Sequence, residues 1–405
     1  KRGHTYQGRV TRNYVACIDV FNGSQYWRRE IPGAYRIRLS YGVSNLALNH
    51  QGLFVAAGAT CHQLDRFTGE TLRAFTIPPA AVEEGYLWGY VAVADGTIIG
   101  SVSKQNVTEW LASEQAPFSN AVFACDLASG ELLWTHRGVN IRKNTIAVSN
   151  GKIFFADTGE LTEEKLENQR VGYAYISRDR RRGKNTEPLA MKPDIWTVTA
   201  VSLKTGALAW RRDVDLADCG GNQMMGLAHD GVLLFGGHFP DAYYHNPRKR
   251  MMALAMRDGR QLWARETNNT TRPLIVGDTI HASPYAFALK TGEPHYMKRN
   301  GKVMMQKNAK TGKLEPRWKT TMIRRGCGPV TAGSHTFFYR SGGAAAHDER
   351  DRSTELFAAT RPGCWINMIP ANGVLFQAEA SSGCVCNYSI QSTVVYAPGN
   401  VSQRR

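Results

Sequence analysis

The chain has 405 residues, with 50 lysines and arginines against 34 aspartates and glutamates and a formal net charge of +16. No run of about 18 apolar residues occurs, which excludes a membrane-spanning helix, and no recognition-helix, RNP or zinc-finger pattern indicates a specific nucleic acid. The basic excess favours an anionic partner, either an acidic protein or an anionic polysaccharide, although solvated basic loops would also produce it. The basic side chains concentrate in Arg178–Lys184, Arg248–Arg250 and Lys298–Arg325.

A five-residue turn recurs along the chain, each time at the end of a short apolar run. The copies are Asp19–Gly23, Asp65–Gly69, Asp126–Gly130, Ser202–Gly206, Ala255–Gly259 and Ala288–Gly292. Most lead within a few residues to a tryptophan, namely Trp27, Trp134, Trp210 or Trp263. A tighter turn such as Asn150-Gly151 lies upstream of each copy, and Gly and Asn tolerate the positive φ of tight hairpins. One unit is therefore two hairpins, that is, four antiparallel strands.

The repeated unit predicts an all-β fold, a β-propeller of four-stranded antiparallel blades. Blades are expected at 44–75, 90–137, 144–213, 222–266, 272–320 and 328–360, with partial blades at 5–31 and 366–398. Two of them carry insertions, at about 157–194 and about 302–318. We expect a single domain of residues 1–405 with eight blades, or alternatively seven. The first blade is incomplete in this chain, and its missing strands are expected before Lys1.

The recurring tryptophans and aspartates are predicted to be structural. An indole on the outermost strand can pack flat between neighbouring blades and bury a large apolar area. An aspartate that begins a turn can accept hydrogen bonds from the backbone of that turn. We therefore expect neither residue type to be catalytic.

Reactive side chains gather in the loops opposite the repeated turns. Because strand direction alternates, these loops all lie on one face of a propeller. They contain the candidate catalytic residues His238, His281, Arg340, Arg361 and Glu379. Histidine can exchange protons and arginine can bind a carboxylate or phosphate. The alternative is that the histidines are hydrogen-bonded surface residues and the arginines cap backbone carbonyls.

Four of the eight cysteines lie in the last fifth of the chain: Cys327, Cys364, Cys384 and Cys386. One interpretation is a disulfide between Cys364 and either Cys384 or Cys386, in an oxidising compartment. A soft-metal site of thiolates and free buried thiols are the two alternatives. A thiolate nucleophile assisted by His281 or His335 is also open.

The repeat Ala-x-Asp-x-x-Thr-Gly-x-x-x-Trp resembles the tryptophan-docking repeat of the quinoprotein alcohol dehydrogenase-like propellers, the PQQ-like (pyrroloquinoline quinone-like) repeat family. The endings Thr360–Gly373 and Glu379–Gln391 are similar to those of an uncharacterised planctomycete-type subfamily. The resemblance implies the propeller fold and an exported, periplasmic or extracellular location. Dehydrogenases of the family carry a disulfide between adjacent cysteines over the quinone, and this chain has no adjacent cysteine pair. We therefore expect no PQQ, while a bound metal stays open.

Two functions fit these features. The first is an exported binding or scaffold module for an acidic protein or polysaccharide, within a larger assembly or alone. The alternative is an enzyme at the Cys/His/Arg-rich mouth of the propeller. It would be a metal- or Cys-dependent oxidoreductase, or a lyase of uronic-acid polysaccharides in which His or Tyr acts as base. Fold does not decide between them on so widely reused a scaffold.

Overall fold

The computed structural model describes residues 14–32, 45–81, 86–104, 118–163, 165, 193–220, 224–237, 250–308, 311–319, 329–357, 360, 362, 368–378 and 393–397. Within them the chain consists of β-strands and their connections, with short 3-10 helices at η2 (Pro79–Ala81) and η3 (Lys143–Thr145). The predicted all-β class is confirmed. No helix among these residues has the length and apolar character needed to cross a membrane. Contacts divide the chain into two compact units, residues 10–19 with 23–268 and residues 1–9 with 20–22 and 269–405.

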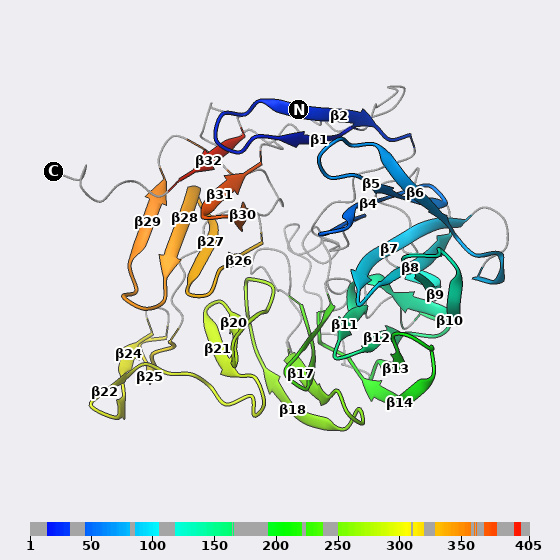
Figure 1. Ribbon diagram of the computed structural model, residues 1–405. Helices are drawn as coiled ribbons and strands as arrows, with labels where there is room; N and C mark the ends of the chain where they lie inside the picture. The colour runs from blue at the N-terminus through cyan, green and yellow to red at the C-terminus, as the bar shows by residue number, and fades with distance from the viewer. Residues whose placement is uncertain are drawn as a thin grey trace, which may run out of the picture. The chain divides into compact units, whose positions relative to one another are not determined.

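The unit of residues 10–19 and 23–268 is a series of antiparallel meanders that follow one another along the chain (Figure 1). A hairpin of β1 (Tyr14–Ile18) and β2 (Gln25–Glu30) comes first. The next sheet contains β3 (Leu46–Asn49), β4 (Gly52–Ala57), β5 (Thr60–Leu64) and β6 (Thr71–Thr76). An eight-stranded sheet follows, of β7 (Tyr86–Ala94), β8 (Thr97–Lys104), β9 (Phe118–Asp126), β10 (Leu132–Arg142), β11 (Ala147–Ser149), β12 (Lys152–Asp157), β13 (Ile195–Ser202) and β14 (Leu208–Asp215). The last sheet contains β15 (Met225–His229), β16 (Val232–Gly236), β17 (Arg250–Ala255) and β18 (Gln261–Glu266).

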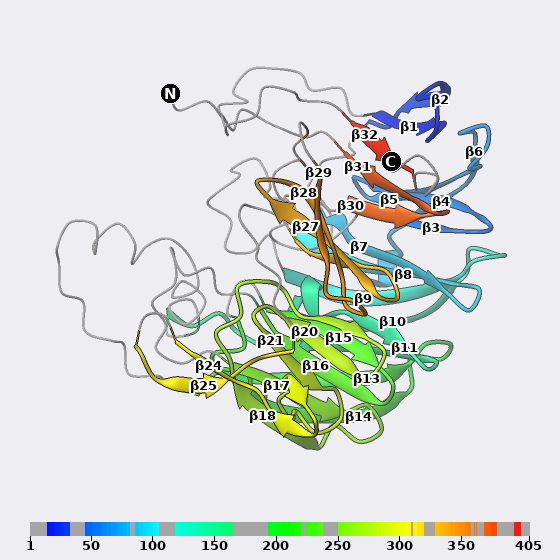
Figure 2. The ribbon, with the colours of Figure 1, turned by 90° about the vertical axis from the view of Figure 1, so that its left-hand side faces the viewer.

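The unit that contains residues 269–405 has shorter strands (Figure 2). It begins with a three-stranded sheet of β19 (Leu274–Val276), β20 (Thr279–Ala282) and β21 (Tyr285–Ala288). Two small hairpins follow, β22 (Lys298–Arg299) with β23 (Lys302–Val303) and β24 (Met305–Lys307) with β25 (Leu314–Pro316). A four-stranded sheet comes next, of β26 (Thr331–Ala332), β27 (Thr336–Ser341), β28 (Gly343–Asp348) and β29 (Thr354–Phe357). The last sheet contains β30 (Met368–Ala371), β31 (Val374–Gln377) and β32 (Val394–Tyr396).

The described part of the chain contains five separate sheets of three or four strands. The sheet β19–β21 has three strands where four are expected, whereas β30–β32 has the three strands of the partial blade expected at 366–398. The eight-stranded sheet contains two meanders, β7–β10 and β11–β14, which are joined at the pair Ile141–Asp157. The count of eight blades and the single domain of 1–405 stay predictions. The two small hairpins lie where the insertion at about 302–318 is expected, whereas most of the insertion at 157–194 lies outside the described residues.

The middle strands carry the core and the outermost strands carry the surface. All five residues of β16 are buried, and Leu233 and Phe235 pack with Met252 and Leu254 of β17 in one apolar cluster. Strands that are covered on both faces have near-continuous apolar sequences for this reason. In contrast, β14 exposes most of its side chains and buries Trp210, which belongs to the same cluster.

The repeated turn has the same hydrogen bonds in every predicted copy. In the second copy the Asp65 N–H donates to the Glu70 carbonyl at 2.8 Å, and the Gly69 N–H donates to the Asp65 carbonyl at 2.9 Å. The Asp65 carboxylate accepts the N–H groups of Phe67 and Thr68 at 2.7 and 2.8 Å, and these bonds hold its pKa below the usual value. The predicted role of the turn aspartate is therefore confirmed. The sequence analysis missed one further copy, between Asn308 and Gly312, which joins β24 to β25.

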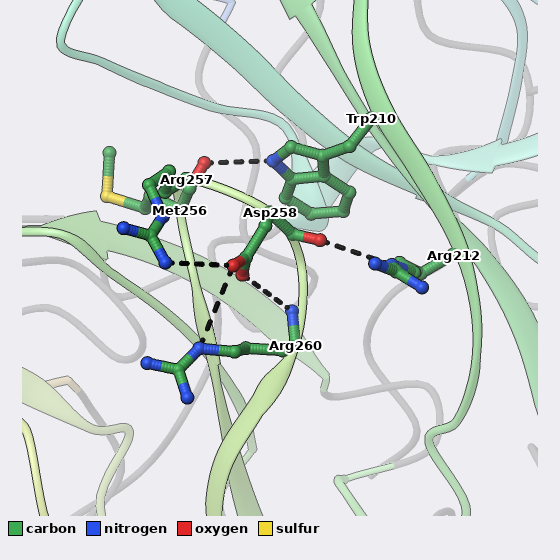
Figure 3. A network of polar contacts seen from close by, with 6 residues as sticks. All are labelled: Trp210, Arg212, Met256, Arg257, Asp258 and Arg260. Carbon is green, nitrogen blue, oxygen red and sulfur yellow. Dashed lines mark hydrogen bonds and ion pairs between the residues drawn. The ribbon is translucent and has the colours of Figure 1, made fainter.

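A tryptophan joins several of the blades to the turn of the next one. The indole N–H of Trp134 donates to the Leu203 carbonyl at 2.8 Å, and that of Trp210 donates to the Met256 carbonyl at 2.9 Å (Figure 3). In both cases the acceptor is the second residue of the following repeat turn. The indole face covers the glycine that ends this turn, so that a Cβ on Gly259 would lie 2.6 Å from the Trp210 ring. The predicted packing of indoles between blades is confirmed.

Replacing the turn glycines separates backbone strain from tryptophan packing. Gly23 and Gly259 occupy the same turn position, with φ of 73° and 71°, but a Cβ at Gly23 would meet no atom within 4 Å. We expect Gly23→Ala to lower the free energy of unfolding by about 1 kcal/mol through the left-handed backbone alone. Gly259→Ala should cost about 1–3 kcal/mol more because the methyl group displaces the indole. Urea denaturation of both variants measures the difference, and equal losses would contradict the packing role.

The blade that contains β6 has no tryptophan at this position. Arg73 lies four residues after Gly69, the spacing at which four other repeats place an indole, and its guanidinium lies 3.3 Å from the position of a Cβ on Gly130. We expect Arg73→Trp to raise the free energy of unfolding by about 1 kcal/mol, because an indole there can cover Gly130 and donate to the Leu127 carbonyl. Arg66→Trp, at an exposed turn residue, is the control. A gain from Arg66→Trp as large as that from Arg73→Trp would show that the position is irrelevant.

Candidate functional site

Most of the predicted site residues lie outside the described residues. These are His238, Arg361, Glu379, Cys327, Cys364, Cys384 and Cys386. The disulfide, the thiolate metal site and the candidate base Glu379 therefore stay predictions. His281 and Arg340 are described, and both are buried, with 5% of each residue exposed.

His281 lies on β20, where it is packed against the neighbouring sheet. Its ring lies 4.6 Å from that of Phe337, and its Nδ1 lies 4.0 Å from Oε1 of Glu349. Burial lowers the pKa of His281 to about 4, and the charges of Lys319 and His295 act in the same direction. A neutral, buried imidazole of this kind is part of the packing between sheets rather than a surface available to a large substrate.

Three of the described cysteines are buried thiols of low reactivity. Cys61, Cys125 and Cys219 are free and buried. Burial raises the pKa of their thiols to about 12, 11 and 12 respectively, so these thiols are protonated at neutral pH. Among the residues that the structure describes, no group of three or more His, Cys, Asp and Glu side chains is arranged to hold a metal ion.

A groove between two successive blades presents the most distinct set of polar groups. It has a volume of about 410 Å³ and lies between β14 on one side and β17 with the start of β18 on the other. Side chains alternate along a strand, so Arg212 and Val214 share one face of β14 while Arg250, Met252 and Leu254 share one face of β17. These two faces form the walls of the groove, with apolar side chains in the middle and arginines toward both ends.

One end of the groove is electrically balanced. The Arg250 guanidinium forms an ion pair with Asp215 at 3.2 Å and donates to the carbonyls of Asp215 and Ala217, each at 2.7 Å. The Asp215 carboxylate also accepts the N–H groups of Asp194 and Ala217 at 2.9 and 3.0 Å. Because its partners are internal, Arg250 acts as a brace between the blades.

The other end of the groove carries an excess of positive charge (Figure 3). Arg212 Nε donates to the Asp258 carbonyl at 3.1 Å, while Arg257 and Arg260 lie 3.3 and 3.7 Å from the Asp258 carboxylate. The side chains of Arg257 and Arg260 are 83% and 65% exposed. Two guanidinium groups thus flank the Asp258 carboxylate, and Arg212 binds the backbone of the same turn. Because Asp213 also lines the groove, the three arginines leave an excess of one positive charge at this end.

A second basic pair, at the end of β10 and the start of η3, is buried. Arg142 and Lys143 are 0% and 4% exposed, and Arg142 Nε lies 3.4 Å from the Met224 carbonyl. Burial lowers the pKa of Lys143 to about 7 and that of Arg142 to about 10. These two side chains belong to the interior, whereas the exposed arginines of the groove are accessible to a partner.

Only one arginine of this groove was noted in the sequence. Arg250 ends the basic stretch Arg248–Arg250, but Arg212 and Arg260 were assigned no role. A usable signal existed in the repeat: Arg212 lies two residues after Trp210 and therefore on the same strand face, toward the next blade. Arg29 has the same relation to Trp27 and donates to the Gly69 carbonyl at 2.9 Å.

Comparison with known proteins gives one family match and several similar structures. A family profile described as outer membrane protein assembly factor BamB matches residues 11–298 and again residues 118–352. BamB from Moraxella catarrhalis is 12% identical over 88% of this chain and 86% of that chain, with a TM-score of 0.45. A europium-containing methanol dehydrogenase is 12% identical over 85% of this chain and 75% of that chain, with a TM-score of 0.42. No curated protein matches the chain.

The buried His281 predicts a pH-dependent stability. Its pKa is about 4 in the folded chain and about 6.5 when unfolded, so between these values the unfolded chain binds the additional proton and stability falls as pH falls. We expect a loss of about 2 kcal/mol between pH 7 and pH 5 from this residue. Urea denaturation of His281→Gln at the two pH values should show a smaller loss than the unsubstituted chain. His229→Gln, at an exposed histidine, is the control, and an undiminished loss in His281→Gln would contradict the assignment.

Proposed function

Because the chain belongs to the family of outer membrane protein assembly factor BamB, a family of PQQ-like repeat β-propellers, we propose that it is a protein-binding scaffold with an acidic partner. The observation that carries the proposal is the family match over residues 11–352, which includes almost all of the described sheets. An assembly factor acts through contacts with other proteins, and a propeller offers rigid blades for such contacts. An exported location is part of the same proposal.

We propose an acidic partner because this chain carries a large positive charge. A net charge of +16 attracts acidic chains and raises their rate of association. The exposed arginines around Asp258 supply a local excess of the same sign. Guanidinium groups pair with carboxylates in a planar, often bidentate geometry, which favours an acidic polypeptide with closely spaced carboxylates.

A quinone cofactor is not part of this proposal. The described thiols of Cys61, Cys125 and Cys219 are buried separately, and the sequence has no adjacent pair of cysteines. The sequence therefore lacks the adjacent cysteine pair of the family's dehydrogenases, and we derive no step through PQQ. The absence of a cofactor stays a prediction, and the enzyme alternative gains no support from the buried His281 and Arg340.

Binding of defined polyanions tests the proposal. Fluorescence anisotropy with labelled poly-L-glutamate should show saturable binding that weakens steeply as salt rises from 50 to 300 mM, because the attraction between exposed charges is screened. Labelled poly-L-lysine of equal length should not bind. No binding of poly-L-glutamate would overturn the proposal. Tighter binding of polygalacturonate than of poly-L-glutamate would overturn the protein partner and favour a polysaccharide.

A further inference from the structure

The groove between β14 and β17–β18 has an accessible cationic group in addition to its braced one. Arg212 is exposed and uses Nε to hold the Asp258 carbonyl. In the described part of the chain no contact engages its two terminal nitrogens. Because Nε is fixed, the direction of the guanidinium plane is also fixed, and the N–H groups on its outer edge can donate two parallel hydrogen bonds to a carboxylate. Arg260 lies beside it, bound only loosely to Asp258 at 3.7 Å.

The floor of the groove is apolar but already packed. Val214, Met252 and Leu254 line its middle, between the two polar ends. Met252 and Leu254 are buried in the core cluster that also contains Trp210, so the part of the groove that a ligand can reach is its polar rim. A volume of about 410 Å³ is within the range of pockets that enclose a ligand, roughly 300–1,000 Å³.

The direction of the groove fits an extended chain. Its walls are two strands, so lining side chains recur at every second residue along it, from Arg250 past Met252 to Leu254. An extended peptide places its own side chains with the same period of two. A segment with an acidic residue at every second position can therefore lie along the rim of the groove and present a carboxylate to the cationic end.

We propose that this groove is the docking site for an extended acidic segment of a partner protein, with a carboxylate of the segment bound by Arg212 and Arg260. The inference rests on the proposed protein-binding function and adds the place of binding and the chemistry of the segment. Arg250 keeps its bonds to Asp215 and Ala217 and holds the two walls at a fixed separation.

Two labelled octapeptides test the proposal by anisotropy, one of alternating Glu and Leu and one of alternating Gln and Leu. The Glu peptide should bind to the full chain, and the Gln peptide at least about 10-fold more weakly, since charge-assisted bonds are roughly twice as strong as neutral ones. The double variant Arg212→Ala/Arg260→Ala should weaken binding of the Glu peptide about 10-fold or more. Equal affinity for both peptides would overturn the carboxylate contact.

Arg29→Ala is the matched control for this variant. Arg29 occupies the repeat position of Arg212 and makes the same kind of bond to a turn carbonyl, but it lies outside the groove. It should leave peptide binding within about 2-fold of the unsubstituted chain. If Arg29→Ala weakens binding as much as the double variant, then binding depends on general charge, and the groove is not the site.

The lysine variant controls for misfolding of the alanine variant. Arg212→Lys/Arg260→Lys keeps both charges and loses the bidentate geometry, so binding should weaken by a smaller factor than in the alanine variant. Full retention of affinity in the lysine variant would overturn the bidentate contact. Binding of poly-L-glutamate that no groove variant weakens would overturn the docking site and leave the proposed function standing. Failure of every acidic probe to bind the unsubstituted chain would overturn both.

Discussion

The contact between a tryptophan and the turn of the following blade determines how neighbouring sheets are placed in the unit of residues 10–19 and 23–268. The indole N–H of Trp210 binds a carbonyl of the turn, and the ring covers Gly259, which has no side chain in the way. The hydrogen bond fixes where the turn lies along the edge of the indole, and van der Waals contact fixes the distance between the turn and the ring. Trp27 and Trp134 make the same pair of contacts with the turns that begin at Asp65 and Ser202.

The candidate groove is a consequence of this contact. Docking of Trp210 brings the face of β14 toward that of β17, and the side chains that follow on β14 then lie opposite the next turn. Arg212 fixes the same turn through the Asp258 carbonyl, and Arg250 ties the far end of the groove to Asp215. The structural residues of the repeat therefore set the spacing of the exposed arginines, and those residues need no role in binding themselves.

The architecture was predictable because it depends on short sequence patterns. Turn glycines with positive φ, turn aspartates and tryptophans at a fixed spacing are local features, and each was assigned its structural role from the sequence. The copy at Asn308–Gly312 was missed because the strands it joins, β24 and β25, have three residues each and contain no apolar run. The absence of a fourth strand from the sheet β19–β21 was not predicted, because the sequence does not show whether a fourth run finds a partner.

The candidate site was less predictable than the fold. His281 and Arg340 have the residue types of a catalytic site, but both are buried, and burial depends on how neighbouring sheets pack. Arg212, in contrast, is an ordinary arginine in the sequence. Its place in the groove becomes evident only when β14 faces β17. Long-range pairing of this kind has no local signal, although the spacing of two residues from Trp210 provides a partial one.

Hydrogen–deuterium exchange of the full chain, with and without the octapeptide of alternating Glu and Leu, measures the place of binding most directly. If the segment docks between β14 and β17–β18, the peptide slows exchange in residues 208–215 and 250–261 and leaves β4 and β5 unchanged. Slower exchange confined to other strands, while the peptide is bound, would contradict the groove as the docking site.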